Sequence, residues 1–216
     1  GVDLDGKELS ALRDLARSRG IYLLAGTVPE TIKGSKKVYN TSLLFGPNGG
    51  VLAKYRKIHL FDITLTGGET HKESAAVKPG AKTVVARTRF MKAGLSVCYD
   101  LRFPELYRRM AMNGARLFFI PAAFTERTGR DHWDVLLRAR AIENLCFVLA
   151  PAQFGANTAS RVTYGRSAII DPWGVVLARA PDMETVALAE LDLDFQDRVR
   201  SDLPCLEHAR KWLSGQ

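Results

Sequence analysis

The chain has 216 residues, of which 46% are hydrophobic and 25% charged, so it can bury a core and has ordinary globular composition. Its net charge of +8 comes from basic residues dispersed along the sequence without a clustered stripe, which argues against nucleic acid as a partner. The longest apolar runs, 117–123 and 145–152, are too short to span a bilayer, so no membrane partner is expected.

The first predicted element is a helix, because apolar residues recur at helical spacing over 9–16 and Gly20 ends the run. A second helix should begin at Pro104, since proline favours the first helical turn, and end near Gly114. Short apolar runs between turn signals predict strands over 21–28, 39–45, 51–55, 83–90, 94–98 and 117–120.

A longer helix is predicted from Asp131, which can cap it, to Asn144. Helices separated by groups of strands predict an α/β layered fold with one sheet packed on another. Because no internal repeat, low-complexity segment or linker interrupts the chain, we expect a single domain over 1–216. Further strands are predicted over 145–152, 164–170, 175–179 and 185–191.

Three cysteines, Cys98, Cys146 and Cys205, have spacings that match no zinc or Cys-x-x-Cys pattern. Their odd number argues against a full disulfide framework, so a reducing cytoplasm is the predicted location. The opening residues GVDLD lack the basic and then apolar start of a signal peptide, which agrees with that expectation.

The segment GLSVCYDLRFPEL places Cys98 at the junction of a strand and a helix. A thiolate is a nucleophile, and a helix N-terminus can lower the pKa of a thiol, so Cys98 is a candidate nucleophile. The alternative is a small buried hydrophobe, the commoner fate of a cysteine in an apolar run. Cys146 and Cys205 have no comparable setting and are predicted to be packing or surface residues.

Other side chains leave two interpretations open. Lys57, among apolar residues in KYRKIHLF, could stabilise an oxyanion or lie on a solvated face. His59 could be the base of a Cys–His pair or a packed histidine. Glu73, in a Gly-rich loop, could be functional or solvated. For Glu143 an ion pair with a basic neighbour on its helix is the preferred interpretation. None of the other histidines has metal-ligand spacing.

Several of these segments recur together in a known order. The sequence resembles the carbon–nitrogen hydrolase (nitrilase) superfamily, most closely its Nit-type amidase branch, and the matching motifs cover nearly the whole chain. Those motifs are YNTSLLFGPNG, AKYRKIHLFD, KES, GLSVCYDLRFPEL, PAAFTERTGRDHWDVLLRARAIEN and YGRSAIIDPWG.

The resemblance implies a four-layer α-β-β-α sandwich and a Glu–Lys–Cys triad that works without a metal or organic cofactor. Cys98 matches the nucleophile and Lys57 the triad lysine, while Glu73 matches a second glutamate that helps to position the site. The backbone N–H of Tyr99 would join Lys57 in holding the oxyanion. His59 is then not the base, because a glutamate has that role in the family.

The implied substrate is a small carboxylate-bearing amide, of the ω-amide or deaminated-peptide amide type. It would be hydrolysed through a cysteine thioester, with release of ammonia. Arg102, His132 and Arg166 are candidates for binding the substrate carboxylate, on charge alone. The resemblance also implies a homodimer or a higher homo-oligomer.

The sequence departs from the family at both ends. The triad glutamate of the family lies in a strand-helix-strand segment that would precede Gly1, and Glu8 does not match its motif. We therefore expect an N-terminally incomplete member that lacks its general base. The final residues, HARKWLSGQ, also differ from the usual family end. The absent glutamate motivates the alternative function, a catalytically inactive homologue that serves as a binding or assembly module.

Overall fold

The structure, a computed structural model, describes residues 1–4, 6–64, 70–158 and 161–214. Its helices are α1 (Ser10–Arg19), α2 (Pro104–Met112), α3 (Glu126–Asn144), α4 (Leu193–Asp202) and α5 (Cys205–Ser214), with 3₁₀ turns η1 (Lys7–Leu9), η2 (Glu73–Ala75) and η3 (Cys98–Arg102). Its strands are β1 (Leu23–Thr31), β2 (Val38–Phe45), β3 (Val51–Arg56), β4 (Asp62–Thr64), β5 (Thr70–Lys72), β6 (Val84–Arg87), β7 (Lys92–Leu95), β8 (Leu117–Phe119), β9 (Phe147–Ala150), β10 (Phe154–Thr158), β11 (Arg161–Tyr164), β12 (Ala168–Ile170) and β13 (Val176–Arg179).

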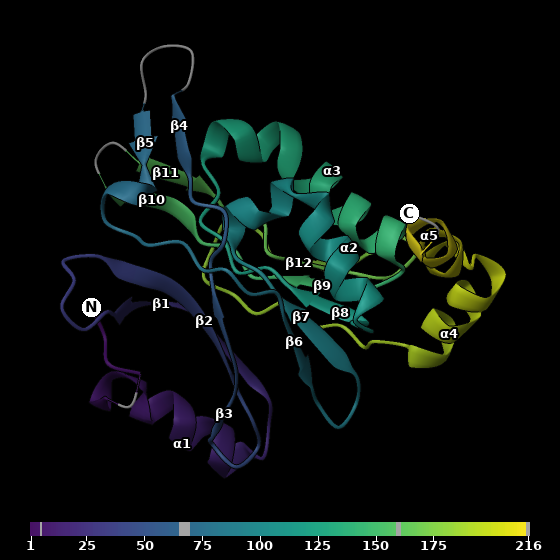
Figure 1. The fold of residues 1–216 in the computed structure, drawn as a ribbon, viewed down its shortest axis with the longest axis horizontal. Coiled ribbons are helices and arrows are strands. Elements are labelled where there is room, and N and C mark those ends of the chain that lie inside the picture. The colour runs from purple at the N-terminus through teal and green to yellow at the C-terminus, as the bar shows by residue number, and fades with distance from the viewer. Residues whose placement is uncertain (5, 65–69, 159–160, 215–216) are drawn as a thin grey trace.

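The first sheet is antiparallel, in the order β1-β2-β3, and carries helix α1 on its outer face (Figure 1). Side chains alternate along β2, because successive residues of a strand point to opposite faces. Leu43 and Phe45 pack in one cluster with Leu9 and Ala16 of the helical layer, whereas Leu44 belongs to the cluster on the inner face. This sheet is therefore buried on both sides.

The second sheet has six strands in the order β13-β12-β9-β8-β7-β6, with β7, β8 and β9 parallel at its centre. Helices α2 and α3 cover the face of this sheet that is turned away from the first one (Figure 1). Gly94 on β7 lies so close to α2 that an added Cβ would approach the sulfur of Met110 to 2.6 Å. Only glycine permits this approach of helix to sheet.

The two sheets pack face to face, since Leu44 and Tyr55 of the first share a buried cluster with Leu95 of the second. The layers therefore follow the order helix, sheet, sheet, helix, which confirms the predicted α/β sandwich. Among the described helices, none combines the length and apolar character that crossing a membrane would require.

Some predicted boundaries are wrong. Helix α3 begins at Glu126 after the extended residue Thr125, so Asp131 lies inside the helix and does not cap it. The predicted strand over 185–191 is absent, and its apolar side chains Val186 and Leu188 are 78% and 81% exposed. Helices α4 and α5 and the hairpins β4–β5 and β10–β11 were not anticipated.

Candidate active site

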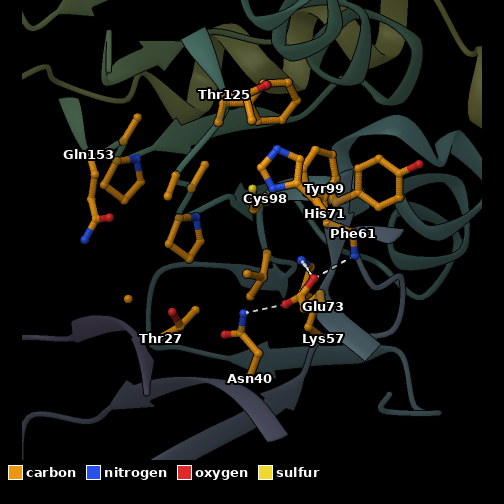
Figure 2. Close-up of a pocket in the computed structure, with 18 of the residues that line it drawn as sticks. Thr27, Asn40, Lys57, Phe61, His71, Glu73, Cys98, Tyr99, Thr125 and Gln153 are labelled. Carbon is orange, nitrogen blue, oxygen red and sulfur yellow. Dashed lines mark hydrogen bonds and ion pairs between the residues drawn. The ribbon is translucent and has the colours of Figure 1, made fainter. Parts of the chain in front are cut away.

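A cavity of about 820 Å³ lies where the ends of both sheets meet, within the size range of small-molecule sites (Figure 2). The first sheet contributes residues of β1 and Asn40 of β2, and the segments after β3 and β5 contribute Lys57 and Glu73. The second sheet contributes Cys98, three residues beyond the end of β7, together with the segments 121–128 and 151–153. Motifs that are far apart in the sequence therefore meet around one space.

Cys98 is the first residue of η3 and has a φ of +50°, the left-handed region that residues other than glycine rarely adopt. Such a conformation costs on the order of 1–3 kcal/mol and persists only where its surroundings enforce it. Its N–H donates to the carbonyl of Pro121 at 2.9 Å. The sharp turn from strand to helix leaves the side chain of Cys98 half-buried at the cavity wall.

Lys57 and Glu73 form an ion pair beside Cys98 (Figure 2). The Lys57 side chain is 3% exposed, and its Nζ lies 2.5 Å from Oε2 of Glu73. The same oxygen accepts the backbone N–H of Phe61 at 2.7 Å, while Oε1 accepts the Asn40 amide at 3.2 Å. Three donors therefore fix the Glu73 carboxylate, and the carboxylate in turn compensates the charge of a buried ammonium.

Burial raises the pKa of the Cys98 thiol, because a thiolate is poorly solvated there. The ammonium of Lys57 and the backbone N–H of Ala123 lower this pKa, whereas the charges of Glu73 and Asp100 raise it further. The balance is a raised pKa.

The backbone N–H of Tyr99 lies in the first turn of η3, where no intrahelical acceptor exists. The neighbouring amides have their own partners, since Cys98 donates to Pro121 and Asp100 donates to the carbonyl of Val97 at 3.0 Å. Tyr99 also lines the cavity next to Cys98. Its N–H and the Lys57 ammonium are thus both donors at the site of the sulfur.

The predicted carboxylate-binding residues lie outside the described lining of the cavity. Arg102 contacts Nδ1 of His132 at 3.2 Å, and its guanidinium lies 5.9 Å and 5.2 Å from the ring centroids of Tyr99 and Phe124, which do line it. Burial lowers the pKa of Arg102. Arg166 forms an ion pair with Asp182 at 2.8 Å. Their contact with substrate stays a prediction.

The remaining candidates have structural surroundings. His59 contacts Asp100 at 2.7 Å and stacks on Phe103 with a centroid distance of 3.7 Å. Glu143 forms an ion pair with Arg140 on the same helix at 3.0 Å, as the sequence predicted. Cys146 is fully buried, which raises its pKa to about 12. No group of three potential metal ligands occurs among the described residues.

Several polar residues of the lining were not anticipated. Asn40, which holds Glu73, lies inside the motif YNTSLLF, and that motif was the one signal that could have indicated it. Thr128 lies inside the motif PAAFTERTGRDHWDVLLRARAIEN, whereas His71 and Gln153 reach the cavity from segments outside the quoted motifs. Only the fold brings them to Cys98.

A strained cysteine beside a buried lysine–glutamate pair, in the cavity of an α-β-β-α sandwich, defines a cysteine-centred hydrolase site of the nitrilase type. The model of the carbon–nitrogen hydrolase family matches residues 1–201, and the chain belongs to this family.

Related proteins agree with this assignment. The chain is 48% identical over 200 residues to a deaminated glutathione amidase from a Synechocystis strain, covering 91% of this chain and 74% of that protein. It is 40% identical over 207 residues to mouse omega-amidase NIT2, covering 96% and 74%. The crystal structure of the C. elegans NitFhit protein superposes with a TM-score of 0.91 at 39% identity. That match covers 97% of this chain and 51% of the NitFhit chain.

Proposed function

We propose that this protein is an amidase that hydrolyses the C–N bond of a small carboxylate-bearing amide through a thioester on Cys98. The observation that supports this most directly is the position of Cys98, which lies in a left-handed turn at the cavity beside the Lys57–Glu73 pair. A nucleophile on such a turn projects from the backbone toward a bound substrate.

In the first half of the reaction, the thiol of Cys98 gives its proton to a general base and the sulfur bonds to the amide carbon. The carbonyl oxygen becomes an oxyanion, which Lys57 and the N–H of Tyr99 would hold as donors fixed in place beforehand. The C–N bond then breaks, the nitrogen takes a proton and leaves as ammonia, and a thioester remains.

In the second half, water gives a proton to the base and adds to the thioester carbon. The C–S bond then breaks, a proton returns to sulfur, and a carboxylic acid leaves. Among the described residues that line the cavity, Glu73 supplies the one carboxylate, and three donors already hold it. We therefore assign Glu73 to positioning Lys57. We propose a second glutamate as the general base, of the kind that the family resemblance implies.

The substrate class follows from the relatives, whose names describe amidases of deaminated glutathione and of ω-amides. Both kinds of substrate carry a carboxylate in addition to the amide. We propose that Arg102, which contacts His132 and lies 5.9 Å from the ring centroid of Tyr99, provides positive potential for that carboxylate. Arg166 is a weaker candidate because of its ion pair.

We further propose a cytoplasmic homodimer. The three cysteines are free thiols, which suits a reducing compartment. Val135 and Ile142 are 66% and 44% exposed on α3, and the turn containing Trp173, 54% exposed, packs against Ile142 through Gly174. This apolar face supports a contact with a second copy of the chain. Light scattering of Val135→Glu, which should be monomeric, tests it.

The function is tested by measuring ammonia release from succinate monoamide, glutarate monoamide and deaminated glutathione. Residues 1–216 are compared with the product of the complete reading frame, and each is compared with its Cys98→Ala variant. Turnover that depends on Cys98 in the complete product, with little in residues 1–216, supports the proposal and the external base. Bound amide without any turnover would instead favour the binding module.

A further inference from the structure

Asp100 has an unusual position next to the site. Its side chain is fully buried, and its two oxygens accept four hydrogen bonds, about the full capacity of a carboxylate. Oδ2 accepts from Tyr55 Oη at 2.7 Å and from the N–H of Val97 at 2.9 Å. Oδ1 accepts from the N–H of His59 at 3.1 Å and from its Nδ1 at 2.7 Å.

These hydrogen-bond partners are neighbours in sequence of Lys57 and of Cys98, the two groups proposed to act together. Tyr55 and His59 flank Lys57 by two residues on either side, while Val97 directly precedes Cys98. The carboxylate of Asp100 therefore joins the end of β3 to the turn that carries the sulfur. The stacking of His59 on Phe103, at an interplanar angle of 7°, also holds its ring against this carboxylate.

We propose that Asp100 is a positioning residue that fixes the Cys98 sulfur and the Lys57 ammonium relative to each other. The inference rests on the proposed function, in which these two groups share one reaction. The negative charge of Asp100 raises the pKa of the Cys98 thiol and so disfavours the thiolate. A contribution to activity must then come from geometry, because the charge itself opposes the nucleophile.

We call Asp100 and its four hydrogen bonds the clamp. Tyr55→Phe tests the proposal, since it removes the hydrogen bond from the Tyr55 hydroxyl to Asp100 but leaves the carboxylate in place. Tyr107→Phe is the matched control: Tyr107 is equally buried and bonds to the hydroxyl of Ser96 at 2.8 Å, not to Asp100. The readout is the rate at which iodoacetamide alkylates Cys98, followed by peptide mapping, which requires no amide turnover. A failure of the proposed function would therefore appear in the ammonia assay, not here.

Tyr55→Phe should slow the alkylation of Cys98 roughly three- to tenfold, because Lys57 moves away from the sulfur and stabilises its thiolate less. In a Lys57→Met background it should have no further effect, whereas Tyr107→Phe should change little in either background. An equal effect of Tyr55→Phe with and without Lys57, or no effect at all, would overturn the proposal.

A second pair of variants tests the other side of the clamp. His59→Leu removes the side-chain donor, and His59→Asn places an amide N–H near the position of Nδ1. The leucine variant should slow alkylation like Tyr55→Phe, and the asparagine variant should restore most of the rate. Equal rates for the two variants would contradict a hydrogen-bonded clamp, because a packing role would not distinguish them in this way.

Discussion

Replacing Glu73 by glutamine removes the charge that compensates Lys57 while the size of the side chain is kept. All three partners of the Glu73 carboxylate are donors, namely the Lys57 ammonium, the Phe61 N–H and the Asn40 amide. A glutamine offers one oxygen and one NH₂ group, so in either orientation at least one donor faces another donor. The variant therefore loses both a charge and part of a hydrogen-bond network.

The magnitude follows from the geometry of the pair. At 2.5 Å and an effective dielectric constant of about 20, the direct attraction is about 7 kcal/mol, most of which offsets desolvation of the two charges. Breaking a buried pair by removing one partner costs about 3–5 kcal/mol. For 216 residues the unfolding entropy is about 0.45 kcal/mol per kelvin, so Tm should fall by about 7–11 °C.

Differential scanning calorimetry measures this fall in Tm. The rate at which Cys98 is alkylated is a second measurement, and it should rise while Tm falls. Because the charge of Glu73 raises the pKa of the Cys98 thiol, Glu73→Gln should lower that pKa and speed alkylation at neutral pH while the protein becomes less stable. Glu105→Gln, at an exposed helix start, is the control for a lost negative charge. An unchanged Tm together with an unchanged alkylation rate would refute the assigned role of Glu73.

Three further results are expected. Lys57→Ala should lower kcat by about 10²–10³, the range for losing one oxyanion donor. Lys57→Arg should not restore kcat, because a planar guanidinium does not replace a compact ammonium. Steady-state assays of the complete product check both. Burial tends to raise the pKa of Glu30, but hydrogen bonds from Arg56, Thr41 and Lys54 outweigh it and hold that pKa at about 2. The ionised Glu30 therefore stabilises the fold fully above pH 4.5, and this stabilisation is lost as the pH falls toward 2. Urea titrations should show this loss in wild type and not in Glu30→Gln. The midpoint of the pH profile for alkylation of Cys98 should lie at a higher pH than the midpoint for an ordinary thiol. A midpoint at a lower pH would contradict the effect of burial.

The order of motifs was enough to predict the layered fold and to bring Cys98, Lys57 and Glu73 into one site, because each lies in a distinctive local segment. The network around them could not be predicted in the same way. Asn40 contacts Glu73 across 33 residues of sequence, and Asp100 contacts His59 across 41 residues. No local sequence pattern indicates such a contact. The effect of burial on the pKa of Cys98 could not be predicted either, since a helix start is visible in a sequence and the degree of burial is not.

The raised pKa of Cys98 and the pairing of Lys57 explain each other when the resting site is considered as a whole. A thiol that is protonated at neutral pH carries no charge, so it can be half-buried beside a neutral Lys57–Glu73 pair without an uncompensated ion. Positive charge at Lys57 is then needed only when the oxyanion forms, and Glu73 disfavours an approaching substrate carboxylate near the sulfur. The uncharged amide is thereby favoured next to Cys98, and the nucleophile appears only when a base takes its proton.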